Sequence, residues 1–280
     1  MAALAPSPVA VEPRLTGTPR YQQMAEAFGL TAQEQLTCGC HVHVAVAADE
    51  EGVAALDRIQ PWLAPLPALN ANSPFWPGTD SSYASFRYQA WGRWPCAGPT
   101  EWFGSARAYQ QAVKNMVATG TLLDSGMVYF DARLSRHYPT LEVRIADVCL
   151  RAQDAALIAA LVRALVETET RAWRSGQPAR PVRAELLRLA AWRASRSGLD
   201  GDLLHPATFR PVPPADAAWL LVEHVTEALH DAGDYATVTA LLSEVLRRGN
   251  GATFQRAAFA RTGSVAGVAA AAAEVTGPRN

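Results

Sequence analysis

The chain has 280 residues, 49% of them hydrophobic, and its 25 lysines and arginines nearly balance its 26 aspartates and glutamates. This composition can bury a substantial core, and the balanced charge argues against a basic nucleic-acid surface or a polybasic membrane anchor. Residues 1–17 lack the apolar centre of a secretory signal, and the longest apolar run, residues 155–166, is too short to cross a bilayer. We expect a soluble cytoplasmic protein that binds small molecules.

The first elements follow from proline content and from the spacing of apolar residues. Residues 1–18 are rich in alanine and proline, which predicts a disordered or poorly packed lead-in. Helical spacing then indicates a helix over residues 20–28 and, after a strand over residues 37–47, a second helix over residues 50–66. Prolines end this second helix.

The strand over residues 37–47 contains an H-x-H pattern. Side chains alternate along a strand, so His41 and His43 share one face and Val42 and Val44 point the other way. Two imidazoles on one face can bind zinc, iron, nickel or copper, and they can equally form hydrogen bonds within the sheet. A zinc-dependent hydrolase is therefore one open interpretation, although the other histidines show no matching spacing.

Residues 69–87 form the longest stretch without clean periodicity. Asparagine, serine, aspartate and aromatic residues are concentrated there, and the stretch ends at Arg87. A polar loop of this length within a compact chain is usually functional or mobile, and the alternative is a long surface excursion.

The second half of the chain predicts two neighbouring antiparallel strands followed by helices. A helix over residues 100–116 precedes strands over residues 128–133 and 139–146, and Asp131 and Arg133 share one face of the first strand. Amphipathic helices are predicted over residues 155–175, 181–197, 214–230 and 235–248. Together these elements predict a single α+β domain, in which an antiparallel sheet packs its apolar face against helices.

The strand over residues 139–146 carries the most informative polar pair. Thr140, Glu142 and Arg144 point to one side, and the apolar residues between them point to the core. A carboxylate there can hold a metal ion while the arginine meets a phosphate, whereas the ordinary alternative is a solvated ion pair. The chain has no P-loop or Rossmann glycine motif, so a nucleotide would be held by metal and arginine on a sheet.

Four stretches in this order carry a resemblance to a known family: CGCHVHVAV, ALNANSPFWPGTDSSYASFR, YFDARLSRHYPTLEVRIADVCL and RRGNGATFQRAAFARTGS. Between about Arg20 and Ser264 the chain resembles the carboxylate-amine ligases of the glutamate-cysteine ligase type 2 family. The resemblance implies a fold like the catalytic domain of glutamine synthetase, an antiparallel sheet forming a funnel. It also implies that ATP and Mg²⁺ are bound, and that the glutamate γ-carboxylate is joined to cysteine or a related amine through an acyl phosphate.

The resemblance also implies roles for individual residues. Glu142 and His41 resemble metal ligands, and Arg144 resembles a catalytic arginine that meets the ATP phosphates, together with His41 and Arg133. Arg87 resembles a catalytic residue that binds the substrate carboxylate. Asn72 is a further candidate for substrate binding, and His43 and Asp131 are candidate lining residues.

One feature of the family pattern is missing from the sequence. Family members begin with a strand rich in glutamates that supplies further metal ligands, and residues 1–36 contain only the isolated Glu12, Glu26 and Glu34. Two interpretations follow: the chain starts late relative to the complete enzyme, or it is an inactive, ligase-fold binding protein. A strand edge left open by the missing segment would favour self-association, so a homo-oligomer is a candidate assembly.

Overall fold

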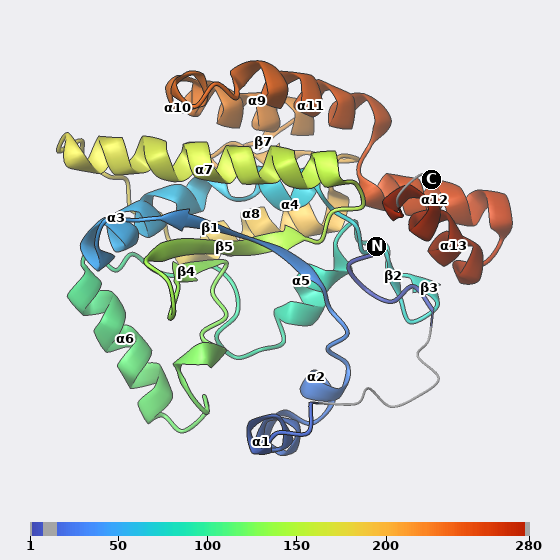
Figure 1. Ribbon diagram of the computed structural model, residues 1–280, viewed down its shortest axis with the longest axis horizontal. Coiled ribbons are helices and arrows are strands. Elements are labelled where there is room, and N and C mark those ends of the chain that lie inside the picture. The colour runs from blue at the N-terminus through green and yellow to red at the C-terminus, as the bar shows by residue number, and fades with distance from the viewer. Residues whose placement is uncertain (1, 8–15, 278–280) are drawn as a thin grey trace.

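The computed structural model describes residues 2–7 and 16–277 (Figure 1). Its α-helices are α1 (Pro19–Phe28), α2 (Leu30–Gln33), α3 (Asp49–Ile59), α4 (Pro65–Leu69), α5 (Phe86–Trp91), α6 (Ala106–Ala118), α7 (Ala152–Arg174), α8 (Ala184–Ser197), α9 (Pro214–His224), α10 (Thr226–Asp231), α11 (Tyr235–Arg248), α12 (Gly251–Thr262) and α13 (Val265–Thr276). Two short 3₁₀ helices are η1 (Gln60–Trp62) and η2 (Ser125–Met127).

A three-stranded antiparallel sheet lies at the centre of the fold. Its order is β1 (Gly39–Ala45), β5 (Thr140–Asp147), β4 (Ala132–Leu134), so β5 is the central strand and β1 lies at one edge. Two separate hairpins pair β2 (Phe75–Trp76) with β3 (Thr79–Asp80) and β6 (Leu203–Leu204) with β7 (Pro211–Val212).

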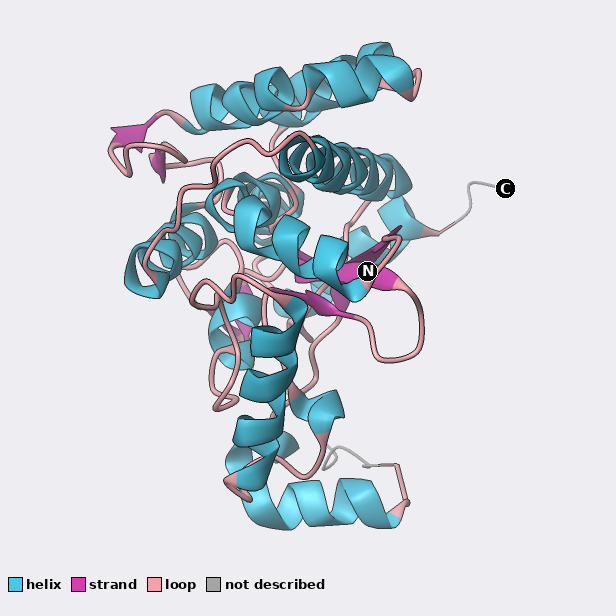
Figure 2. Ribbon diagram, turned by 90° about the vertical axis from the view of Figure 1, so that its left-hand side faces the viewer, coloured by secondary structure: helices cyan, strands magenta, loops and turns pink. Residues whose placement is uncertain are grey.

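Helices lie on both sides of this sheet. In Figure 1, α7 runs along one face of the sheet and α9, α10 and α11 lie beyond it, whereas α5 and α6 lie on the opposite side. Figure 2 shows the molecule from the side, with most strands at mid-height and helices both above and below them.

The core forms where α7 covers the apolar side of the sheet. Leu157, Leu161 and Leu165 follow one another at four-residue spacing along α7, are buried, and share one hydrophobic cluster with Leu141 and Val143 of β5. Burial of this stripe stabilises the 23-residue helix α7. The expected α+β fold with an antiparallel sheet is confirmed.

Several boundaries differ from the sequence-based prediction. The helix predicted over residues 50–66 is divided into α3, η1 and α4, the strand predicted over 128–133 is β4 at Ala132–Leu134, and α12 and α13 were not predicted. In the N-terminal segment, Ala3 and Leu4 are buried, and the Ala3 N–H donates to the carbonyl oxygen of Asn72. Disorder is therefore wrong for residues 2–7. The other part of that prediction, over residues 1 and 8–15 with Glu12, lies outside the described residues.

Within the described residues, none of the helices combines the length and the apolar character that a bilayer crossing requires.

Candidate active site

Glu142 occupies the middle of the sheet face that points away from α7. On the central strand β5 it lies opposite His43 of β1 and opposite Arg133 of β4. Arg133 Nε donates to Glu142 Oε2 at 2.8 Å, and His43 Nε2 lies 3.6 Å from Glu142 Oε1. Three neighbouring strands therefore bring a guanidinium, a carboxylate and an imidazole onto one row of the sheet.

Arg144 and His41 complete the cluster, helped by an irregularity in the sheet. The strand register passes from Cys40 opposite Ala146 to Val42 opposite Val143, so β5 has one extra residue in this interval. Arg144 Nη1 donates to Glu142 Oε1 and lies 3.4 Å from His41 Nδ1. We call Glu142, Arg133, Arg144, His41 and His43 the Glu142 cluster. The structure thus brings together five of the residues that the sequence singled out.

The electrostatics of the cluster favour an ionised carboxylate among cations. Burial acts to raise the pKa of Glu142, but hydrogen bonds with His41 and Arg133 and the charge of Arg144 outweigh it, so the pKa lies far below its usual value. The contact with Glu142 acts to raise the pKa of His41, yet burial and the Arg144 charge prevail and lower it. Burial also lowers the pKa of Arg144. Two guanidiniums thus share one carboxylate, and the cluster carries surplus positive charge.

This arrangement does not fit a magnesium ion held by the cluster itself. Both oxygens of Glu142 already contact cationic or imidazole nitrogens, and it is the cluster's one carboxylate. Throughout the described part of the chain, no group of three or more histidines, cysteines, aspartates or glutamates is placed to hold a metal ion. The surplus positive charge suits an anion such as phosphate or carboxylate better than a cation.

A pocket of about 690 Å³ opens beside the cluster and provides space for a ligand. Glu142, Arg133 and His43 lie at its floor, α6 supplies one wall and the loop between β4 and β5 supplies another. The residues that the sequence analysis did not select include Arg20, Asp49, Lys114, Asp124, Arg136, His137 and Tyr138. One available signal was the basic and aromatic composition of the loop RLSRHYP, which joins the two polar strands.

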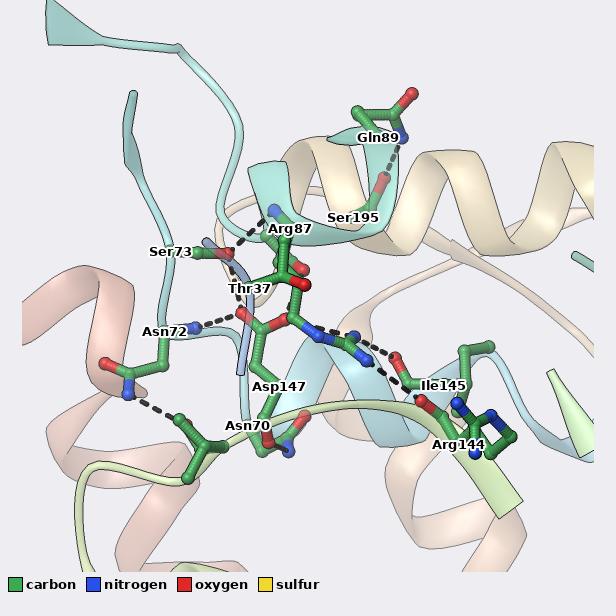
Figure 3. Close-up of polar contacts among 12 residues, drawn as sticks. Thr37, Asn70, Asn72, Ser73, Arg87, Gln89, Arg144, Ile145, Asp147 and Ser195 are labelled. Atoms are coloured by element: carbon green, nitrogen blue, oxygen red, sulfur yellow. Dashed lines mark hydrogen bonds and ion pairs between the residues drawn. The ribbon is translucent and has the colours of Figure 1, made fainter. Parts of the chain in front are cut away.

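Arg87 of α5 is buried, and its two terminal guanidinium nitrogens contact protein groups, whereas its Nε has no hydrogen-bond partner. Its guanidinium donates to the carbonyl oxygens of Arg144 and Ile145 and lies 3.6 Å from Asp147 (Figure 3). Gly39 of β1 leaves the space for it, because a Cβ there would lie 2.3 Å from Arg87 Nη2. Arg87 is only 3% exposed and does not line the pocket.

The polar loop over residues 69–87 is held around Asp147, which is buried. The carboxylate of Asp147 accepts hydrogen bonds from the Asn72 backbone N–H and from the hydroxyls of Ser73 and Ser85, each at 2.8 Å (Figure 3). The Asn72 side chain donates to the Val148 carbonyl, and Gln255 of α12 donates to Asn72. Asn72 is therefore a buried link between the loop, β5 and α12.

Asp131 lies next to β4, also buried. Tyr88 donates a hydrogen bond from its hydroxyl to Asp131 Oδ2 at 3.0 Å. Burial raises the pKa of Asp131 to about 7, although the Tyr88 hydrogen bond acts in the opposite direction. The structure thus separates Asp131 from Arg133, whose guanidinium contacts Glu142.

The comparisons with known proteins agree on one family. The family model described as glutamate-cysteine ligase family 2 matches residues 1–273. A protein of Streptomyces avermitilis named "Putative glutamate--cysteine ligase 2-1" is 58% identical over 265 residues, which cover 95% of this chain and 73% of that protein. One of Streptomyces coelicolor, "Putative glutamate--cysteine ligase 2", is 56% identical over 271 residues, covering 97% of this chain and 75% of that protein.

A solved structure supports the fold. The glutamate-cysteine ligase (gshA) of Francisella tularensis, crystallised in complex with AMP, superposes with a TM-score of 0.56 at 12% sequence identity, over 84% of this chain. The match spans 60% of the length of that enzyme. From the family match and the two close relatives, the chain belongs to glutamate-cysteine ligase family 2.

Proposed function

We propose that the protein is an ATP-dependent carboxylate-amine ligase that joins the γ-carboxylate of glutamate to the amino group of cysteine or of a related amine. The observation that carries this proposal is the Glu142 cluster, in which Arg133 and Arg144 share one carboxylate, with Arg133, Glu142 and His43 lining a 690 Å³ pocket. The names of the relatives and the AMP complex of the structural neighbour agree with a ligase that uses a nucleotide.

In this mechanism the cluster acts on developing negative charge. Arg144 and Arg133 neutralise charge on the phosphoryl group as it passes from ATP to the glutamate carboxylate, which yields an acyl phosphate and ADP. The amine then attacks the acyl carbon and phosphate leaves. His41 is largely neutral at pH 7 because its pKa is lowered, so it offers a nitrogen lone pair or an N–H to the same ligand.

Glu142 has an organising role in this proposal. Its carboxylate fixes both guanidiniums and orients the two imidazoles, and it lines the pocket together with Arg133 and His43. Magnesium, which the family resemblance implies, does not fit the cluster by itself, and no step of this mechanism depends on it.

For Arg87 and Asn72 we propose positioning roles in place of direct substrate contact. Arg87 donates to the carbonyl oxygen of Arg144 itself, and so fixes the backbone from which the Arg144 side chain extends. Asn72 ties the polar loop to β5 and α12. Substitution of either residue would then affect nucleotide binding through the geometry of β5.

The test is a coupled assay on the purified chain with ATP, Mg²⁺, glutamate and cysteine. The expected products are ADP and γ-glutamylcysteine in equal amounts, and a panel of other amines in place of cysteine tests the acceptor. Absence of ADP from a sample with a cooperative unfolding transition would overturn the ligase proposal for this chain.

The second candidate is a ligase-fold protein that binds a nucleotide or another polyanion without turnover. The single carboxylate of the cluster favours it, because phosphoryl transfer usually uses carboxylate-held metal ions. Calorimetry with ATP separates the two candidates: binding without any ADP release supports the second, and stoichiometric product supports the first.

A further inference from the structure

The rim of the 690 Å³ pocket carries two cationic side chains without a carboxylate partner. Lys114 extends from α6, and Arg136 belongs to the loop between β4 and β5, on the other wall. Both are exposed, and neither forms an ion pair within 4 Å in the described part of the chain. They differ in this respect from the other cations of the same pocket.

The remaining pocket arginines are neutralised by neighbours. Arg20 forms a two-point contact with Asp124, at 2.6 and 3.0 Å, and Arg133 is held by Glu142 at 2.8 Å. Arg144 does not line the pocket itself, but it shares the floor residue Glu142 with Arg133, so one guanidinium charge next to the floor is also in excess. The pocket thus has unbalanced positive charge at two places, the floor and the rim.

Two separate positive regions in one cavity suit a ligand with two anionic groups. A cleft lined by charge of one sign concentrates the field and attracts oppositely charged ligands. Lys114 of α6 and Arg136 of the β4–β5 loop both line this cavity, so an anionic group bound there can contact cations from two separate elements. Asp49 of the same lining accepts a hydrogen bond from Gln110 of α6 and keeps its negative charge, so it offsets one of the two rim cations and leaves the other in excess.

We propose that Lys114 and Arg136 form a second anion-binding subsite, which holds one phosphate or carboxylate group of a ligand whose other anionic group lies beside Arg133 and Arg144. This inference rests on the proposed function, and it names the two side chains that orient the bound substrate. The anionic group has two possible sources, the phosphate chain of ATP and a carboxylate of glutamate, and the experiment distinguishes them.

The experiment exploits the fact that Lys114 is the only lysine of the chain. Limited acylation with an amine-reactive ester, followed by peptide mass spectrometry, measures the reactivity of its ammonium group directly, with the α-amino group of the chain as an internal reference. The protein is labelled alone and with saturating ATP, inorganic triphosphate or glutamate, and calorimetry on the same samples establishes which ligand is bound.

If the subsite exists, a bound ligand should slow the labelling of Lys114 about fivefold or more, while the labelling rate of the reference α-amino group stays the same. Protection by ATP and triphosphate identifies phosphate as the group, and protection by glutamate identifies carboxylate. Bound ATP and bound glutamate that both leave Lys114 fully reactive would overturn the subsite while the ligase proposal stands. Failure of every ligand to bind would overturn both.

Charge variants provide the second arm. Lys114→Gln and Arg136→Gln are each expected to lower the affinity for the protecting ligand about twofold to fivefold, which is the size of effect typical of exposed ion pairs. Lys114→Arg keeps the charge and is expected to bind the ligand as the unsubstituted protein does. Arg107→Gln is the matched control, because Arg107 is an exposed cation of the same helix outside the pocket lining. In the ligase assay the two rim variants should raise KM and leave kcat nearly unchanged. An equal effect of Arg107→Gln would contradict a local subsite.

Discussion

Arg133 and Glu142 face one another across the β4–β5 pair, and their side chains meet in a hydrogen bond of 2.8 Å. Because His43 lies opposite Glu142 on the other side, the carboxylate is held from both neighbouring strands. The position of every charged group in the pocket floor therefore depends on this one acidic side chain.

Glu142→Ala is expected to abolish nucleotide turnover and to destabilise the fold. Removal of the carboxylate leaves Arg133 and Arg144 buried next to each other without compensation, which typically costs about 3–5 kcal/mol. Urea unfolding measures the stability and ADP release measures the activity. The matched control is Glu185→Ala, since Glu185 pairs with Arg183 at the same two-residue spacing but on the exposed surface. Full activity in Glu142→Ala would refute its organising role.

Arg144→Lys is expected to weaken ATP binding about tenfold and to reduce ADP release while the fold persists. Lysine keeps the charge but loses the planar fork that meets Glu142 and His41 and lies 5.9 Å from the Trp91 ring. Calorimetric titration with ATP measures the effect. Arg93→Lys serves as control, because Arg93 also pairs with a glutamate and lies 5.7 Å from a tryptophan ring, away from the cluster. Equal losses in the two variants would contradict the prediction.

Asp131→Asn is expected to change how stability depends on pH. An exposed aspartate titrates near 3.8, whereas burial raises the pKa of Asp131 to about 7. The folded protein therefore keeps a proton that the unfolded chain has lost, and this group makes stability fall as pH rises between these two values. The asparagine still accepts the Tyr88 hydrogen bond and carries no such penalty.

The stability gained by Asp131→Asn should thus grow across this window, by at most about 1.4 kcal/mol per pH unit, and stay constant above it. Urea unfolding of both proteins over a pH series measures the difference. Asp216→Asn, at an exposed position on α9, controls for the loss of one charge. A difference that does not vary with pH would contradict the buried titration.

Asp147→Asn is expected to destabilise the protein by about 2–4 kcal/mol, because a buried carboxylate that accepts three hydrogen bonds loses its charge and part of its acceptor capacity. The loss of stability should be largest in the polar loop over residues 69–87 and at Arg87. Hydrogen exchange of the Asn72 amide, which donates to Asp147, reports this directly. Unchanged protection of that amide would contradict the role of Asp147 as the centre of the loop.

The polar face was predictable because alternation along a strand is a local property. Thr140, Glu142 and Arg144 share the face expected of them, and His43 Nδ1 lies 2.9 Å from Thr140 Oγ1 across the strand pair. The H-x-H and E-x-R patterns therefore indicated one common surface before any tertiary contact was known. The roles given to single residues on it stay predictions.

The partners of Arg87 were not predictable from local pattern. They depend on the extra residue in β5 opposite His41 and on the long-range closure of the polar loop onto Asp147, and neither leaves a periodic signal in the sequence. Lys114 and Arg136 also line one pocket only because α6 and the β4–β5 loop border the same cavity. Sequence patterns thus identified the surface, while tertiary packing decided which cations remain available on it.

Strand β1 has a practical consequence for handling the protein. It lies at the margin of its sheet, so alternate backbone amide and carbonyl groups point away from β5 toward solvent. An extended segment of another molecule can form hydrogen bonds with these groups and add to the sheet as a further strand. Concentrated preparations should therefore gain intermolecular β-structure on storage, seen as a growing low-frequency amide I band. A proline at Ala45, whose N–H points away from β5, should slow that growth.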